Sequence, residues 1–318
     1  MNKLALATGL LLLGLALDVS AAHAQLARTF VSSQGSDSND CNRLTPCRTF
    51  QRAHDNTLAA GEITVLDPGG YGAVTITKGI SIINDGVGEA GALVSGGLNG
   101  ITIAAGASDA ISLRGLTVKG IGFGGGNGIV FSTGKSLTVE NCVIRNMSDT
   151  NGIGLLFQPT GSSTLAMSNT LVADNTNTGV VISAQGAGSS VKAAFNRIQS
   201  LNNGVAGVVV GGVAATGTVN ATVLDSIASN NGNAGFAVVS SAGMVMGLTV
   251  TRSVSAKNSA GIAAVGGTAT LRLSRSTLTA NTTTWVSTNG GILASYGDNR
   301  IDGNRDTNPA LPTTLAAK

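Results

Sequence analysis

Short apolar runs alternate with glycine and small polar residues along most of the chain, and this pattern repeats. A glycine preceded by Asn, Ala or Thr and followed by an apolar run recurs at intervals of 24 to 29 residues. Repetition at a nearly constant interval of this length is typical of a protein built from stacked structural units. The repeated glycines are Gly100, Gly128, Gly152, Gly179, Gly207, Gly235, Gly261 and Gly290.

Each repeat contains three short strand-like runs and no helical pattern. In one repeat these runs are residues 128–131, 137–139 and 143–144. Alternation of apolar and polar residues within the runs predicts strands with one buried face. Leucine-rich repeats have a similar length, but the signature they require is absent. We therefore predict an all-β fold, a single-stranded right-handed parallel β-helix solenoid, because crossovers between parallel strands are nearly always right-handed.

Two polar positions repeat in phase with the glycine. Asparagine tolerates the left-handed backbone of a tight bend, and equal side chains in coils about 4.8 Å apart can hydrogen-bond to one another. We call these two positions the first and the second polar marker. We expect the residues two before and two after the first marker to face the core. The first marker comprises Asn141, Asn169, Asn196, Asp225, Arg252 and Arg275, and the second comprises Asn175, Asn202, Asn231, Asn258 and Asn281.

The start of the mature chain carries the signals of a short helix. Thr45 and Pro46 precede residues 48–60, and Gly61 follows them, which is the order of an N-cap, a first helical position and a C-terminal stop. Because a solenoid must protect its ends, we predict that residues 48–60 form a capping helix. His54 lies on the inner face of that helix, and we interpret it as a structural residue.

The first 24 residues have the features of a signal peptide. Lys3 precedes an apolar stretch at 4–17, and Ala22 and Ala24 flank a cleavage site. The stretch is shorter than the roughly 20 residues that span a membrane, so we expect a secreted or periplasmic protein without a transmembrane segment. The predicted organisation is a signal peptide at 1–24, an N-terminal loop and capping helix at 25–61, a parallel β-helix at 62–297 and a polar tail at 298–318.

Export places the three cysteines in an oxidising compartment. Cys41 and Cys47 lie six residues apart in a polar loop, and we expect them to form a disulfide. The alternative, a metal site, lacks the His/Cys cluster that would complete it. We expect Cys142 to be an unpaired small residue in a strand, and we predict neither a metal site nor a cofactor.

The N-terminal segments resemble those of a known superfamily. The runs TPCRTFQ at 45–51, GEITVLDPGGYG at 61–72 and VTITK at 74–78 resemble the first part of right-handed parallel β-helix proteins of the pectate-lyase-like superfamily. That superfamily includes pectate lyases, pectin esterases, polygalacturonases and many bacterial exported proteins of unknown role. The resemblance implies the fold, whereas function must be argued from a site.

The acids that polysaccharide cleavage would require are scarce. Hydrolysis needs paired carboxylates, and lyases of this superfamily use carboxylates to hold Ca²⁺ beside a basic residue. Asp149 and Asp174 are one repeat apart and Arg145 is near Asp149, so these three are weak catalytic candidates; the alternative is that they are solvated loop residues. The acids between residues 90 and 290 are Asp109, Glu140, Asp149, Asp174 and Asp225.

One strand of each repeat is expected to turn uncharged residues outward. Contiguous apolar patches usually mark contact surfaces, so we predict a contact face that is covered by loops, by another protein or by a second copy. The alternative is an inert surface of small residues. The outward positions are Val130, Gly154, Val181, Val209, Ala237 and Ala263.

Composition narrows the function. The chain has 42% hydrophobic residues and a net charge of +3, so it should fold. Only 3% of its residues are aromatic and no basic run occurs, which disfavours a nucleic-acid partner. Two functions remain: a non-catalytic solenoid that binds a glycan or a protein partner, and a polysaccharide lyase or hydrolase with a non-standard site. Acid scarcity favours the first.

Overall fold

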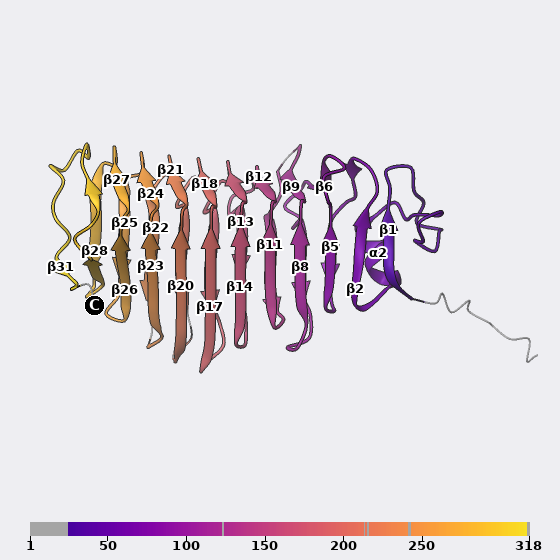
Figure 1. Cartoon of the computed structure of the whole chain (residues 1–318), viewed down its shortest axis with the longest axis horizontal. Coiled ribbons are helices and arrows are strands. Elements are labelled where there is room, and N and C mark those ends of the chain that lie inside the picture. Colours follow the sequence, from indigo (N-terminus) through magenta and orange to yellow (C-terminus); the bar gives the residue numbers. More distant parts are fainter. Residues whose placement is uncertain (1–24, 123, 213, 215, 241–242, 317–318) are drawn as a thin grey trace, which may run out of the picture.

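The chain forms a stack of parallel strands along one axis. The computed structural model describes residues 25–316 except 123, 213, 215 and 241–242, so the predicted signal peptide at 1–24 lies outside the described residues. Figure 1 shows a right-handed parallel β-solenoid of about ten turns, with a small helix near its N-terminus. The predicted all-β fold is confirmed.

Each coil contributes one strand to each of three sheets, here called A, B and C, in that order along the chain. Every strand pairs in parallel with the strand one coil before and one coil after it. Sheet A contains β1 (Leu26–Val31), β2 (Thr57–Val65), β5 (Ile80–Ile83), β8 (Ala110–Arg114), β11 (Ser136–Glu140), β14 (Ser163–Ser168), β17 (Ser189–Asn196), β20 (Gly217–Leu224), β23 (Val245–Thr251), β26 (Ala269–Ser274), β29 (Ile292–Ser295) and β31 (Thr313–Thr314).

Sheets B and C complete the triangular coil. Sheet B contains β3 (Gly69–Gly70), β6 (Ala90–Val94), β9 (Thr117–Gly120), β12 (Val143–Arg145), β15 (Leu171–Ala173), β18 (Gln199–Leu201), β21 (Ile227–Ser229), β24 (Val254–Ala256), β27 (Thr277–Thr279) and β30 (Arg300–Ile301). Sheet C contains β4 (Val74–Ile76), β7 (Ile101–Ala104), β10 (Asn127–Thr133), β13 (Ile153–Phe157), β16 (Val180–Ala184), β19 (Val208–Gly212), β22 (Ala234–Ser240), β25 (Ala260–Val265) and β28 (Thr283–Thr288).

The core lies inside the coil, where inward side chains of successive strands stack. In β17, buried Val191 and Phe195 alternate with exposed Lys192 and Ala194. In sheet C, the rings of Phe131 and Phe157 stack with their centroids 4.4 Å apart. Burial of such aromatic and aliphatic side chains is the main favourable term for folding.

The first polar marker occupies the corner between sheets A and B, with one correction. The register pairs Met167 with Phe195, so Arg197 and not Asn196 takes the left-handed corner position, with φ 54°. The residues two before the corner are buried as expected, with Phe195 in place of Ala194. The expectation for the residues two after the marker holds only for Ile198, which is buried because it directly follows the true corner residue Arg197. Counted from the true corner residue, the residues two after it face outward, and the residues one and three after it are buried. The outward set is Val143, Leu171, Gln199, Ile227, Val254 and Thr277.

The second marker forms a buried asparagine ladder between sheets B and C, also with one correction. Asn203, not Asn202, holds the ladder position, because Asn202 is exposed on the preceding turn. Each side-chain amide of the ladder donates to the side-chain oxygen of the next coil, so these buried amide groups are satisfied. The ladder runs through Asn175, Asn203, Asn231, Asn258, Asn281 and Asn304.

The capping helix α2 (Phe50–Asn56) is shorter than the predicted helix at 48–60. Cys47 pairs with Val31 of β1, which keeps the chain extended there, and the N-cap is Thr49 in place of the predicted Thr45. The chain returns to a strand at Thr57, since residues 57–65 join sheet A as β2. The helix therefore fits between two strands of one sheet.

The N-terminal end of the stack is closed by polar contacts. His54 Nε2 accepts a hydrogen bond from the Thr77 backbone N–H at 3.2 Å, and Gln51 Oε1 accepts one from Thr75 at 2.8 Å. These contacts satisfy the open edge of β4, which would otherwise invite pairing with another strand. The loop over β1 is closed by a disulfide between Cys41 and Cys47.

At the C-terminal end, the tail folds back over the last coil. Trp285 Nε1 donates to the Pro309 carbonyl oxygen at 3.2 Å, and Leu311 is buried against the core. β1 and the strands β30 and β31 belong to the stacked sheets. The stack therefore extends beyond the predicted range 62–297 at both ends.

Candidate functional site: a groove along the corner of sheets A and B

Most coils turn from sheet A to sheet B through only two residues. The first residue adopts a left-handed conformation and projects its side chain into solvent, as Asn141 (φ 54°), Asn169 (φ 47°) and Arg197 (φ 54°) do. The second residue is buried. From β11 to β26, successive corners therefore place one exposed polar side chain every coil, about 4.8 Å apart.

The corner after β5 is longer and forms a wall. Residues 84–89 join β5 to β6, and buried Asn84 holds them in place. Its Nδ2 donates to the carbonyl oxygens of Gly88 and Gly115, both at 2.8 Å, and its Oδ1 accepts from the N–H groups of Gly86 and Val87. This fully bonded amide makes the wall rigid.

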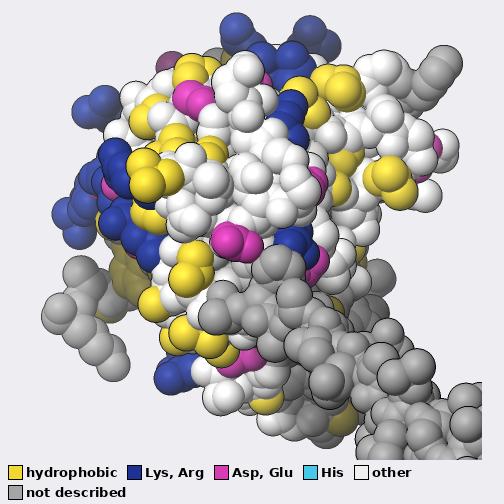
Figure 2. Space-filling model, turned by 90° about the vertical axis from the view of Figure 1, so that its right-hand side faces the viewer, with side chains coloured by type: hydrophobic (Ala, Val, Ile, Leu, Met, Phe, Trp, Pro, Cys, Tyr) yellow, Lys and Arg dark blue, Asp and Glu magenta, His cyan; other side chains and the backbone are white. Residues whose placement is uncertain are grey.

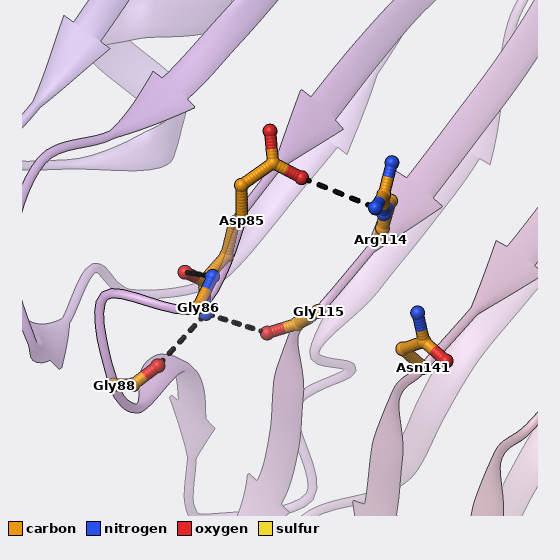
Figure 3. A pocket seen from close by; sticks show the side chains of 7 residues that line it. Asp85, Gly86, Gly88, Arg114, Gly115 and Asn141 are labelled. Atoms are coloured by element: carbon orange, nitrogen blue, oxygen red, sulfur yellow. Dashed lines mark hydrogen bonds and ion pairs between the residues drawn. The ribbon is translucent and has the colours of Figure 1, made fainter.

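A cavity of about 600 Å³ lies between this wall and the next two corners. Asp85 Oδ1 and Arg114 Nη2 are 3.5 Å apart at its rim. Figure 3 shows Asn141 across the cavity from the wall, and within the described part of the chain its side-chain amide makes no hydrogen bond. The cavity is lined by Asn84, Asp85, Gly86, Gly88, Arg114, Gly115 and Asn141.

A second depression of about 430 Å³ continues from the first and shares Asn141 with it. Arg197 Nε donates to Asn169 Oδ1 at 2.7 Å, which orients both side chains. Burial raises the pKa of the Cys142 thiol at the floor to about 11, so the thiol stays protonated and is a poor nucleophile. The lining residues are Asn141, Cys142, Val143, Asn169, Thr170, Leu171, Arg197 and Gln199.

Together these depressions form one groove, here called the corner groove, over the coils from β5 to β17. Four coil spacings give it a length of about 19 Å. Its exposed polar groups are mainly side-chain amides and guanidinium groups, which donate and accept hydrogen bonds without strong acidity. Such a surface suits a ligand rich in hydroxyl groups.

The carboxyl groups of Asp225 and Asp298 have lowered pKa values. A hydrogen bond from the Arg252 side chain lowers the pKa of Asp225, and one from the Arg275 backbone N–H lowers the pKa of Asp298. A general acid in glycoside hydrolysis needs the opposite shift. Neither carboxyl lines the corner groove.

The structure places the catalytic candidates outside the groove. Asp174 lies on the turn after β15, where its Oδ1 accepts from Asn202 Nδ2 at 3.1 Å, and Asp149 Oδ1 accepts from the Thr150 N–H at 2.8 Å. Arg145 ends β12, and its Nε is buried without a partner among the described residues. In the described ranges no ion pair joins Arg145 to either acid, and no group of three His, Cys, Asp or Glu residues could hold a metal ion.

The structure brings the predicted contact residues together in one column. Strand pairing aligns Val130, Val181, Val209 and Ala237 on the outer face of sheet C. Leu156 replaces Gly154 in this column, because Leu155 and not Ile153 pairs with Ile129. The groove residues themselves were missed in the sequence; their signal was the first polar marker, which we interpreted only as a bend.

The chain is similar to several known proteins. A family described as "right handed beta helix region" matches residues 99–278, more than half of the chain. The structure of pectate lyase Pel9A is similar with a TM-score of 0.51 and 14% identity, over 90% of this chain and 82% of that one. A rhamnogalacturonan lyase (TM-score 0.44, 10% identity, 84% and 75% coverage) and a GH136 lacto-N-biosidase from Eubacterium ramulus (0.44, 10%, 92% and 67%) are more distant. No curated protein sequence matches.

None of the described helices has the length and apolarity needed to cross a membrane.

Proposed function

Since this chain belongs to the right-handed β-helix family, we propose that it is an exported, non-catalytic solenoid that binds a glycan chain lengthwise in the corner groove. The periplasm or the extracellular space is its proposed location. The observation that carries the proposal is the groove itself, which crosses successive coils and offers hydrogen-bonding groups on each.

The repeat of the groove matches the repeat of a sugar chain. Three successive coils of the groove each present one corner side chain, Asn141, Asn169 and Arg197, and a polysaccharide presents hydroxyl groups at a regular interval of similar size. Asn141 lies at the centre, because it lines both depressions. Rigid donors and acceptors lose little entropy when a ligand binds, which favours affinity without a deep pocket.

Catalysis is the weaker alternative. A polysaccharide lyase or hydrolase would need ionisable groups that converge on a scissile bond. The corner groove contains one carboxylate, Asp85, which is paired with Arg114. The candidates Arg145, Asp149 and Asp174 would have to act elsewhere on the surface.

The test is a glycan array followed by calorimetry with the best-binding polysaccharide, together with an assay for released reducing or unsaturated ends. Asn141→Gly removes the central amide but keeps the left-handed backbone, which glycine adopts freely. We expect affinity to fall about 3- to 10-fold. Asn289→Gly is the matched control, because Asn289 is also exposed and left-handed but lies outside the groove.

The proposal fails if no glycan binds or if Asn141→Gly and Asn289→Gly bind equally to the wild type. Release of sugar ends by the wild type would establish the enzymatic alternative instead. Loss of that release in Asp149→Asn or Asp174→Asn would then assign the catalytic role to the carboxylates.

A further inference from the structure

Asparagine directly followed by glycine occurs six times in the chain, and the two residues of such a pair can react with each other. The backbone nitrogen of the glycine attacks the side-chain carbonyl carbon of the asparagine, and glycine has no side chain that hinders the approach. The reaction needs a backbone N–H without a hydrogen bond and an amide that is free to rotate. The asparagines of these pairs are Asn99, Asn127, Asn151, Asn203, Asn231 and Asn289.

Hydrogen bonds between coils protect four of these pairs. Asn203 and Asn231 are buried in the ladder, and the N–H groups of the glycines that follow them donate to the carbonyl oxygens of Asn175 and Asn203, at 2.8 and 3.0 Å. Asn127 Nδ2 donates to Asn99 Oδ1 at 3.0 Å. The amide groups of these four asparagines are therefore held in place.

The pair of Asn151 and Gly152 is protected at the nitrogen. Asn151 is exposed, and its side chain makes no hydrogen bond within the described ranges. Gly152, however, is buried, and its N–H donates to the Asp149 carbonyl oxygen at 2.9 Å. This bond must break before the Gly152 nitrogen can attack the amide.

The pair of Asn289 and Gly290 is free at both groups. Both residues are exposed in the turn between β28 and β29. In the part of the chain that the structure describes, neither the Asn289 amide nor the Gly290 N–H has a hydrogen-bond partner. The turn is closed by the next residue, Gly291, whose N–H donates to the Thr288 carbonyl oxygen at 3.0 Å. Gly267 of the preceding coil lies alongside and has no side chain that would shield the amide.

We propose that Asn289 is a site of spontaneous deamidation. The Gly290 nitrogen gives up its proton to hydroxide and forms a bond to Asn289 Cγ. The bond from Cγ to Nδ2 breaks, and Nδ2 takes up a proton from water and leaves as ammonia. Water then opens the resulting succinimide ring at one of its carbonyl carbons. Opening at the side-chain carbonyl gives isoaspartate's isomer aspartate when the backbone bond is kept, and opening at the backbone carbonyl gives isoaspartate.

The product fits the fold and changes the charge. Aspartate tolerates the left-handed backbone that Asn289 adopts, with φ 53°, and isoaspartate lengthens the backbone only within an exposed turn. Figure 2 shows most of the visible Lys and Arg side chains on the left and upper edges of the molecule. The reaction adds one negative charge to this chain, whose net charge is +3. Asn289 lies outside the corner groove, so the proposal does not depend on glycan binding.

The test is incubation of the folded mature chain at mildly alkaline pH, followed by digestion at acidic pH and mass spectrometry that separates the amide, aspartate and isoaspartate forms of each peptide. Asn151 is the matched control within the chain, because both asparagines follow a threonine and precede a glycine. We expect Asn289 to react about 3- to 10-fold faster than Asn151, since only the Gly152 N–H must first release an acceptor. Asn203 and Asn231 should stay intact until the chain unfolds.

Two further measurements tie the reaction to this turn. In urea, the rates at Asn289 and Asn151 should converge, because unfolding removes the protection of Gly152. On cation exchange, the intact wild type should gain an earlier-eluting acidic form, and Asn289→Gly should gain it more slowly. The proposal is overturned if folded Asn289 reacts no faster than Asn151, if the difference between them persists in urea, or if Asn289→Gly gains the acidic form as fast as the wild type.

Discussion

Asn203 donates from Nδ2 to Oδ1 of Asn231 at 3.0 Å, and both side chains are buried between sheets B and C. Asn231 in turn donates to Asn258 and to the Ser200 carbonyl oxygen, and its Oδ1 also accepts from the Asn203 backbone N–H. One side chain therefore satisfies polar groups of three successive coils. The ladder couples neighbouring coils, whose stability is otherwise a sum of local terms.

We predict that Asn231→Ala lowers the free energy of unfolding by about 3 kcal/mol, because it leaves several buried polar groups without partners. Urea denaturation followed by circular dichroism measures this. The control is Asn230→Gly, since Asn230 is adjacent, exposed and left-handed and makes only one side-chain bond, to Asn202. The control should change stability by less than about 1 kcal/mol. Equal effects of the two variants would contradict a stabilising role for the buried ladder.

His54 gives the N-terminal cap a dependence on pH. Burial lowers its pKa below the ordinary value of 6.5, and its Nε2 accepts from the Thr77 N–H, which requires the neutral ring. Below pH about 6.5 the unfolded chain takes up a proton that the folded chain resists. Stability should therefore decrease as the pH falls from about 6.5 to the folded pKa, and level off below it.

Melting temperatures of the wild type and His54→Gln between pH 8 and 5 test this prediction. Glutamine can still accept from Thr77 but does not titrate. The difference between the two proteins should be constant above pH about 7 and change in favour of the variant below it. A difference that does not vary with pH would show that His54 titrates alike in the folded and unfolded chains.

The cysteines should differ sharply in reactivity. Cys41 and Cys47 are bonded, and the loop that they close pairs with β1 through the Cys47 N–H and the Phe30 carbonyl oxygen. Cys142 is buried and protonated. We predict that iodoacetamide labels Cys142 only after unfolding, and that mass spectrometry of unreduced peptides shows a crosslink between Cys41 and Cys47. Opening this short loop by Cys41→Ser with Cys47→Ser should cost about 2 kcal/mol. Labelling of native Cys142 would contradict its burial.

The sequence predicted the coil but not its phase at every position. Residues 137–139 and 143–144 lie in strands as expected, since alternation alone identifies a buried face. Alternation does not identify the buried residue where two polar residues are adjacent. Asn202 and Asn203 are chemically equal, and only the contact with Asn231 decides which one lies inside. Position within a bend depends on partners from other coils, which a single sequence does not display.

The candidate site was harder to predict than the fold. We chose the catalytic candidates Arg145, Asp149 and Asp174 because they are charged. The corner groove is instead lined by asparagine amides such as Asn141 and Asn169, whose left-handed backbone forms the bend between sheets A and B. Its wall arises from a local insertion at residues 84–89, where Gly86 and Gly88 both have positive φ. The position of this insertion beside Arg114 and Asn141 follows only from the stacking of three coils.

The wall at residues 84–89 is held by the buried amide of Asn84 and carries the exposed ion pair of Asp85 with Arg114. We predict that the amide contributes more to stability than the ion pair does. Asn84→Ala removes four hydrogen bonds that hold residues 86–88 and Gly115. We expect it to lower the free energy of unfolding by about 2 kcal/mol and to speed hydrogen exchange at the Gly86 and Val87 amides, which lose their acceptor. Asp85→Asn is the control, because the pair with Arg114 is exposed and should contribute less than about 0.5 kcal/mol. If the wall shapes the corner groove, Asn84→Ala also weakens glycan binding, although Asn84 is too buried to contribute much direct contact. An Asn84→Ala protein with wild-type exchange rates would show that the glycine backbone holds the wall without the amide.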